Sequence, residues 1–370
     1  MNNVIFENRL NLLRSKFAGY GVDTVWIIQP ENRRYLSGFQ AADGQLDESS
    51  GCLFITSDQA LLLTDSRYTI QAQQEVVGFE VVTHKKGLID ILPEIFDRLH
   101  TRKLGFEGGY LIWETYQKAK EKASQHSPSV ELTELSNLVE EIRKIKKPEE
   151  VDRLSRAAQL MGDVLARVIE ELRPGQVEKD IAWKIETLIR EQGADGVSFP
   201  PIVASGPNGA LPHAVPAERR IGEGEPIILD VGAKIDGYCS DMTRTVFLGN
   251  PPSDFKEIYR VVRKAQVFAL ESVRPGMKSD EADSIARDVI INAGFGDFFG
   301  HSLGHGIGMA PHERPSVGPL KPEVLQEGMV FTIEPGIYIP GKGGVRLEEM
   351  VVLQENSARV LTTNKNFYSF

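Results

Sequence analysis

The sequence has very little cysteine and no long apolar run, and both shortages restrict what the protein can be. Its 370 residues include only two cysteines, Cys52 and Cys239, so neither a disulfide framework nor a thiolate metal site is expected. Cys239 lies two residues before Asp241, but we interpret it as a small packed strand residue and not as a nucleophile. No stretch approaches the length of a transmembrane helix, and residues 1–14 predict an amphipathic helix without the apolar core of a signal peptide. We therefore expect a cytoplasmic protein that binds no membrane.

Basic residues are outnumbered by acidic ones. The chain has 42 Lys and Arg against 52 Asp and Glu, a formal net charge of −10, which argues against nucleic acid or an anionic membrane as a partner. The one dense basic stretch is I-R-K-I-K-K at residues 142–147, just before a Pro-Glu-Glu helix start at Pro148. We interpret this stretch as a solvated face between two domains and not as a binding patch.

Several motifs of well-known enzyme classes are missing. The chain has no G-x-x-x-x-G-K-[ST] phosphate loop and no serine nucleophile elbow. His301 and His305 have the spacing of a helical zinc pair, but no Glu follows His301. The glycines at 304, 306 and 308 also disfavour a helix there, so this interpretation is rejected.

The chain is long enough for two domains with a large buried core. Its first part alternates strands and helices and predicts a small α/β domain. The helices are expected at 6–20, 68–76, 87–99 and 115–123, and the strands at 24–28, 51–56, 60–64, 78–83 and 103–107. The pattern then changes to a long helix over 148–172. We place an N-terminal domain at 1–138, a linker at 139–147 and a second domain at 148–370.

The second domain contains an internal repeat. V-I-E-E-L-R-P-G and A-L-E-S-V-R-P-G begin two segments whose later features recur in the same order. The matched residues are Arg173 and Arg274, Gly193 and Gly294, His213 and His312, and Asp230 and Glu334, which are 101, 101, 99 and 104 positions apart. Two copies of one helix–helix–strand unit, related by a pseudo-two-fold axis, explain this order most simply.

Each copy carries two acids in apolar strands that are joined through a glycine-containing hairpin. Asp230 and Asp241 belong to the first copy, and Glu334 and Glu348 to the second. If the copies face each other, four carboxylates converge, and they cannot all stay ionised without cations. Oxygen-rich ligand sets suit divalent ions, and bridging carboxylates suit two metals roughly 3.5–4 Å apart.

Other residues near these acids are assigned by their position. Glu349 should point away from Glu348 because side chains alternate along a strand, and Asp236 should lie at a turn tip. His305, among its glycines, is expected to bring a nitrogen ligand to the metals. His213 and His312 each follow a proline and are candidates for acid–base or oxyanion-stabilising roles.

Together these motifs resemble a known family. D-V-G-(eight residues)-D-M-T-R-T, G-H-G-I-G, T-I-E-P-G-I-Y and G-V-R-L-E are similar to the signature of the pita-bread metallopeptidases. That family includes aminopeptidase P, prolidase, methionine aminopeptidase and creatinase. N-R-R-Y-L-S-G-F and T-D-S-R-Y resemble the creatinase-type N-terminal domain. The resemblance implies an α/β (α+β) protein with a pita-bread catalytic domain and a smaller creatinase-like α/β domain.

The resemblance also implies the ligands and cofactors. Asp230, Asp241, His305, Glu334 and Glu348 match the family's metal ligands. Asp241 and Glu348 would bridge two divalent metals that share a water or hydroxide, and Glu334 would assist deprotonation of that water. Manganese is our first choice, and these ligands also accept cobalt, zinc or iron.

The remaining matches concern the substrate. His213, His301 and His312 match histidines that contact the substrate and stabilise the intermediate, and Tyr338 and Arg346 match a pair beside the metals. We expect an Xaa-Pro aminopeptidase or dipeptidase that acts on proline-containing peptides or dipeptides and forms a homodimer. The alternatives are a creatinase-like hydrolase of another C–N bond and a non-enzymatic binding protein. The sequence leaves dipeptidase and aminopeptidase equally open.

Overall fold

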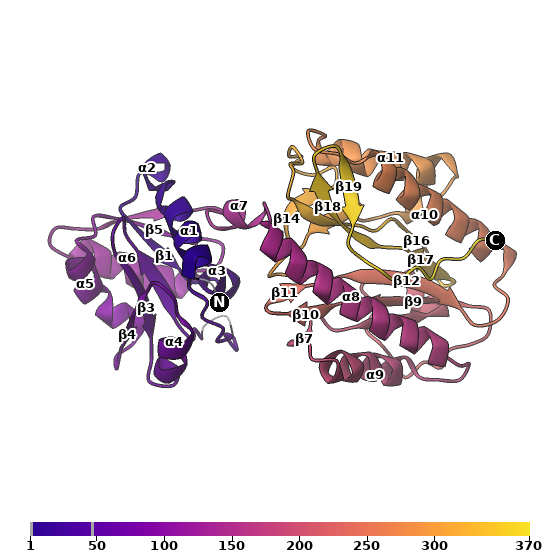
Figure 1. Ribbon diagram of the computed structural model, residues 1–370, viewed down its shortest axis with the longest axis horizontal. Helices are drawn as coiled ribbons and strands as arrows, with labels where there is room; N and C mark the ends of the chain where they lie inside the picture. The colour runs from indigo at the N-terminus through magenta and orange to yellow at the C-terminus, as the bar shows by residue number, and fades with distance from the viewer. Residues whose placement is uncertain (1–2, 46–47) are drawn as a thin grey trace. The chain divides into compact units, whose positions relative to one another are not determined.

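The computed structural model describes residues 3–45 and 48–370, and residues 1 and 2 of the expected N-terminal helix lie outside the described part (Figure 1). The chain divides into two compact units, Met1–Ile142 and Arg143–Phe370. The predicted linker limits, 139 and 147, remain a prediction. In the described ranges, no helix is both long enough and apolar enough to cross a membrane.

The N-terminal unit is built on one six-stranded sheet in the order β4-β3-β2-β1-β5-β6. Only β2 runs antiparallel to its neighbours, whereas β3 and β4, β1 and β5, and β5 and β6 pair in parallel. Its strands are β1 (Thr24–Ile27), β2 (Cys52–Ile55), β3 (Ala60–Thr64), β4 (Glu80–Thr83), β5 (Lys103–Phe106) and β6 (Glu131–Glu134). Its helices are α1 (Asn3–Arg14), α2 (Phe17–Tyr20), α3 (Pro30–Ser37), α4 (Thr69–Glu75), α5 (Leu88–Leu99) and α6 (Trp113–Gln125), and α7 (Glu140–Arg143) leads into the second unit. Apolar residues of α5 and α6 pack against the sheet in one core.

Several details of this unit differ from the sequence prediction, and one is the edge strand β6, which was missed because its sequence, E-L-T-E, is short and polar. The single helix expected over 6–20 is two helices, because α1 ends at Arg14 and α2 begins at Phe17. At the break, the Ser15 hydroxyl donates a hydrogen bond to the Leu12 carbonyl, which competes with continued helical bonding. Helix α3 was missed because its sequence, P-E-N-R-R-Y-L-S, is too polar to show a clear apolar period.

The C-terminal unit consists of two similar halves. Its helices are α8 (Pro148–Glu171), α9 (Glu178–Glu191), α10 (Ser253–Ser272) and α11 (Ser279–Asn292). The first half has strands β7 (Gly196–Val197), β8 (Ile202–Ser205), β9 (Pro226–Val231), β10 (Ala233–Ile235), β11 (Tyr238–Cys239) and β12 (Met242–Phe247). The second has β13 (Gly304–Gly306), β14 (Glu313–Val317), β15 (Val330–Ile333), β16 (Gly336–Ile339), β17 (Gly343–Arg346), β18 (Glu349–Gln354) and β19 (Ser357–Val360). In Figure 1 the pairs α8–α9 and α10–α11 flank these strands.

Hydrogen bonds at matching places confirm the internal repeat. The amide of Gly175 donates to the carbonyl of Ile221, and the amide of Gly276 donates to that of Leu325, both at 2.8 Å. In each half, a central strand lies between two antiparallel partners: β9 between β8 and β12, and β15 between β13 and β18. Each helix pair buries its apolar face against the strands of its own half, so each half has a core of its own.

Helix α8 starts where the sequence predicted. Pro148 occupies the first turn, and the Glu150 carboxylate accepts a hydrogen bond from the Lys147 amide at 3.0 Å. Proline is pre-organised for this position, and an acid there satisfies a free amide at the helix terminus. The helix start is therefore fixed locally by the sequence.

The basic stretch before α8 is not solvated, and that interpretation is wrong. Arg143, Lys144 and Lys146 are buried in the C-terminal unit. Arg143 and Lys146 form ion pairs with Glu313, and Lys144 pairs with Glu323. The acids lie about 170 residues further along the chain, so no local pattern reveals them. Cationic side chains this buried require such partners.

The two acids predicted to lie outside the site do so. Glu349 is buried on the opposite side of β18 from the site and pairs with the buried Arg244 at 3.1 Å. Asp236 lies at a turn with a positive φ of 51° and pairs with Arg156 at 2.8 Å, where both side chains are about half exposed. Cys239 is a buried residue of β11, as predicted.

These two ion pairs should differ strongly in their contribution to stability. Glu349→Ala leaves the Arg244 charge buried without its carboxylate, so we expect the free energy of unfolding to fall by about 3–5 kcal/mol. Asp236→Ala breaks an exposed pair and should lower it by about 1 kcal/mol or less. Equilibrium urea unfolding of both variants measures the difference, and equal losses would contradict this assignment.

Candidate metal centre

The strands of the two halves bring the five predicted ligand residues to one place. Each residue is in a strand or directly beside one: Asp230 in β9, Asp241 before β12, His305 in β13, Glu334 after β15 and Glu348 before β18. All five line a cavity of about 460 Å³. The two halves are joined here, since the Glu348 amide donates to the Thr243 carbonyl at 3.1 Å. Acids from both repeats therefore face one another, as the sequence suggested.

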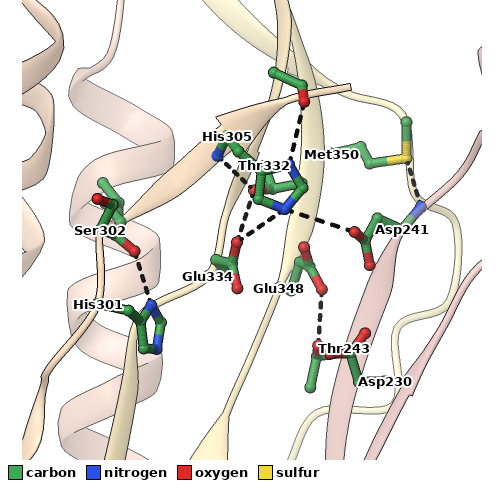
Figure 2. Close-up of polar contacts among 12 residues, drawn as sticks. Asp230, Asp241, Thr243, His301, Ser302, His305, Thr332, Glu334, Glu348 and Met350 are labelled. Carbon is green, nitrogen blue, oxygen red and sulfur yellow. Dashed lines mark hydrogen bonds and ion pairs between the residues drawn. The ribbon is translucent and has the colours of Figure 1, made fainter. Parts of the chain in front are cut away.

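His305 is at the centre of this group, and Figure 2 shows the carboxylates gathered around its ring. Its Nε2 atom lies 3.3 Å from Glu334 Oε1 and 3.7 Å from Asp241 Oδ2. Its Nδ1 atom lies 3.1 Å from the Gly306 carbonyl, so Nδ1 carries the donated proton and Nε2 is the atom available to a metal. Asp241, His305 and Glu348 each offer one ligand atom within 4.8 Å of the other two.

Two threonines hold the carboxylates in place. The Thr332 hydroxyl donates to Glu334 at 3.0 Å and accepts a hydrogen bond from the His305 amide at 3.1 Å. The Thr243 hydroxyl donates to Glu348 at 2.7 Å. The sequence analysis missed both threonines, although each lies two residues from an acid in its strand. Alternation puts such residues on the same face, which is the signal that could have identified them.

Three buried carboxylate oxygens in the cavity have no hydrogen-bond partner among the described residues. They are Asp230 Oδ1, Asp241 Oδ1 and Glu348 Oε1. Buried polar atoms without partners are rare in folded proteins, because each loses its hydration without compensation. Coordination of a divalent cation would satisfy them, and an imidazole with several carboxylates is a suitable ligand set. The residues present therefore fit a metal centre.

The acids share their charge unequally. Burial raises the pKa of Glu348 to about 8, and the charges of Glu334 and Asp230 add to this. Burial also raises the pKa of Asp241, together with the charges of Glu348, Asp230 and Glu334. For Glu334 burial acts in the same direction, but the hydrogen bond and charge of His305 lower its pKa to about 2. Without metal, Glu334 is therefore ionised, and protons neutralise part of the charge of Glu348 and Asp241.

His305 takes the complementary charge. Burial alone would lower its pKa, but the hydrogen bond with Glu334 and that acid's charge raise it to about 9. The metal-free protein thus holds an imidazolium–carboxylate pair at neutral pH. A metal would replace the proton on Nε2.

A chain of hydrogen bonds leads from Asp230 to a second histidine. Arg346 donates to Asp230 Oδ2 at 2.5 Å and to the Tyr338 hydroxyl at 2.8 Å. That hydroxyl lies 2.9 Å from His301 Nε2, while His301 Nδ1 lies 2.8 Å from the Ser302 carbonyl. Burial lowers the pKa of His301 and raises that of Tyr338 to about 12. The neutral Nδ1–H tautomer of His301 fits these contacts, with Tyr338 as donor.

The other two predicted histidines line the same cavity. His213 lies on an exposed loop, and His312 is exposed with its ring 4.0 Å from that of His305. Burial and the charge of His305 lower the pKa of His312. Both imidazoles can therefore reach a molecule bound in the cavity.

At two positions of G-H-G-I-G, the neighbouring backbone lies too close for any side chain. A Cβ atom on Gly304 would lie 1.9 Å from the Thr332 carbonyl oxygen, and one on Gly306 would lie 2.2 Å from the Arg314 carbonyl oxygen. A side chain at either position would push β13 away from its neighbours and move His305. The backbone must approach closely here for the imidazole to reach the acids.

Comparisons with known proteins agree with this geometry. Residues 152–355 match the family model described as metallopeptidase family M24, and residues 9–145 match the creatinase/prolidase N-terminal domain. The chain is 38% identical to the Xaa-Pro dipeptidase of Pyrococcus furiosus, with 96% of this chain and 98% of that protein covered.

Solved structures give the same result. The fold is similar to that of an Xaa-Pro dipeptidase from Bacillus anthracis, with a TM-score of 0.90, 38% identity and coverage of 97% of this chain and 98% of that one. It is also similar to an X-Pro aminopeptidase from Thermotoga maritima, with a TM-score of 0.83, 35% identity and coverage of 94% and 97%.

Metal binding at neutral pH should release protons from the site. At pH 7 Glu348 and His305 are mainly protonated in the metal-free protein, and a cation requires their deprotonated forms. We expect Mn²⁺ binding to release about two protons per site at pH 7, one from each of these residues, and to tighten as the pH rises. Titration calorimetry in buffers of different ionisation enthalpy counts these protons. Glu348→Gln should release fewer, and binding without proton release would contradict the charge distribution.

Proposed function

This chain belongs to metallopeptidase family M24, and from that premise we propose that it hydrolyses Xaa-Pro bonds in dipeptides or at the N-terminus of peptides. The observation that carries the proposal is the set of unpartnered carboxylate oxygens around His305, which suits a cation better than any other ligand. Similarity to proteins described as Xaa-Pro dipeptidases, over nearly the whole of each chain, supports the choice of substrate.

In this proposal the metal site holds two divalent cations, with manganese as the first choice. The family resemblance implies that Asp241 and Glu348 would be shared between the two cations, and each offers a ligand atom within 4.8 Å of the other and of His305. Asp230, His305 and Glu334 complete the set. Oxygen-rich sites suit manganese, and cobalt, zinc or iron are also accepted by these ligand types. When bound, such cations lower the pKa of water and polarise a peptide carbonyl.

The residues of the chain supply the proton transfers and the orientation. Glu334 is the proposed general base, because the family resemblance gives it this role and its Oε1 atom lies at the cavity, 3.3 Å from His305 Nε2. His213 and His312 are proposed to stabilise the oxyanion and to protonate the departing nitrogen. Arg346 and Tyr338 hold Asp230 and His301 in fixed positions by the hydrogen bonds described above.

One wall of the cavity suits a proline ring. Besides the polar residues, the lining includes Phe199, Pro200, Ile202 and Pro212. Apolar surface next to a few convergent polar groups is typical of small-molecule sites. The nitrogen of an Xaa-Pro bond carries no hydrogen, so we propose that the ring is recognised by its shape against this wall. A homodimer, which the sequence resemblance implies, is also part of this proposal.

Hydrolysis of short proline peptides tests the function. We expect Mn²⁺-loaded protein to cleave Gly-Pro, Gly-Pro-Pro or both, and to leave Gly-Ala intact. Asp241→Asn should reduce kcat/KM by about 10³-fold or more, because it weakens a shared ligand. The exposed Asp236→Asn variant is the matched control and should keep wild-type activity. If neither proline peptide is cleaved at any metal loading, the peptidase proposal fails and another C–N hydrolase or a binding protein becomes the better explanation.

A further inference from the structure

A buried cluster of charges lies outside the metal site and directly beside one of its histidines. The Glu313 carboxylate forms an ion pair with Arg143 at 2.5 Å and another with Lys146 at 2.7 Å, and both cations donate hydrogen bonds to it. The exposed fractions of these side chains are 7% for Glu313, 3% for Arg143 and 1% for Lys146. Glu313 follows His312 in the chain, whereas its two partners lie in the basic stretch that precedes α8.

The glutamate is ionised in this environment. Burial would raise its pKa, but the charges of Lys146 and Arg143 and the hydrogen bond from Lys146 lower it. An ionised and doubly paired carboxylate fixes the backbone that carries it, because any displacement would leave three charges buried and poorly paired.

The same carboxylate also lies against the motif that contains His305. A Cβ atom on Gly308 would lie 2.2 Å from Glu313 Oε1, so the glutamate passes directly over this glycine. In the pairing of β13 with β14, Glu313 lies opposite Gly306, and the register shifts between His305 and Gly306. The segment that carries His312 is thus attached to the segment that carries His305.

Within residues 3–45 and 48–370, His312 has few other contacts that fix its position. It is exposed, and its described ring contact is with His305, at 4.0 Å between centroids and 70° between planes. An exposed imidazole that must meet a substrate depends on the backbone on either side of it.

We propose that Arg143 and Lys146, acting through Glu313, are positioning residues that hold His312 at the metal site for the hydrolytic step. The basic stretch at residues 142–147, which the sequence analysis interpreted as solvated, would then help to position a histidine of the active site. The kinetic part of this inference rests on the proposed peptidase function, whereas the placement of His312 does not.

The chain offers a matched control for this ion-pair cluster. Lys144 pairs with Glu323 at 2.9 Å, and the exposed fractions of the two side chains are 11% and 14%. Lys144 belongs to the same basic stretch as Lys146, and in Lys144→Met the Glu323 carboxylate would keep its ion pair with Arg314 at 3.1 Å. Lys144→Met therefore removes a buried charge, as Lys146→Met does, and should leave His312 in place.

Steady-state kinetics with Mn²⁺ on a cleaved proline peptide form the first test. Glu313→Gln should lower kcat by about 10- to 100-fold with little change in KM, since a displaced group loses transition-state contacts. Lys144→Met should stay within about 2-fold of wild type. Lys146→Met should reproduce the defect and Lys146→Arg should restore most of kcat. The Lys146 variants, which keep Glu313 paired with Arg143, also decide the question if Glu313→Gln does not fold.

A second readout does not depend on activity or metal. Carbon-13 spectra of the metal-free, histidine-labelled protein should contain signals from seven imidazoles, and the His312 signal is assigned by its loss in His312→Gln. That signal should shift or broaden in Glu313→Gln and in Lys146→Met and stay unchanged in Lys144→Met. Wild-type kcat and an unmoved His312 signal in Glu313→Gln, or equal effects of Lys144→Met and Lys146→Met, would overturn the proposal. If wild type cleaves no proline peptide, the proposed function fails and the spectra alone decide the positioning.

Discussion

Repulsion among carboxylates in a buried cavity is the constraint on which the C-terminal unit depends. Asp230, Asp241, Glu334 and Glu348 come from two halves of one internal repeat, and their oxygens face a shared space with His305. Without cations, burial and this repulsion raise the pKa values of Glu348 and Asp241, and the hydrogen bond with Glu334 raises the pKa of His305 to about 9. Divalent cations would remove the repulsion, so their binding would stabilise the folded state that the unpaired carboxylates otherwise destabilise.

The fold supports this arrangement by holding each acid from outside the cavity. Thr243 and Thr332 donate hydrogen bonds to Glu348 and Glu334, so the acids are oriented before any cation binds. Such pre-organisation lowers the reorganisation needed during catalysis. The repeat places the acids of the two halves symmetrically around the cavity. The halves also differ, because only the second half brings a histidine ligand, His305 in β13, to the acids.

Much of this site could be predicted from the sequence because its signals are local. Strand alternation, glycine positions and the recurrence of motifs about 100 residues apart identified the four acids and separated Glu349 from Glu348. The ion pairs of Arg143 and Lys146 could not be predicted, because their partner Glu313 lies in another strand and a basic run looks solvated by itself. Burial of a charged residue is decided by tertiary contacts, which no local pattern shows.

The presence and place of the metals are the central claim, and anomalous diffraction tests them most directly. A crystal of the Mn²⁺-loaded protein, measured on both sides of the manganese absorption edge, should show two peaks enclosed by Asp230, Asp241, His305, Glu334 and Glu348. Peaks elsewhere, or an empty cavity with these side chains turned toward solvent, would contradict it.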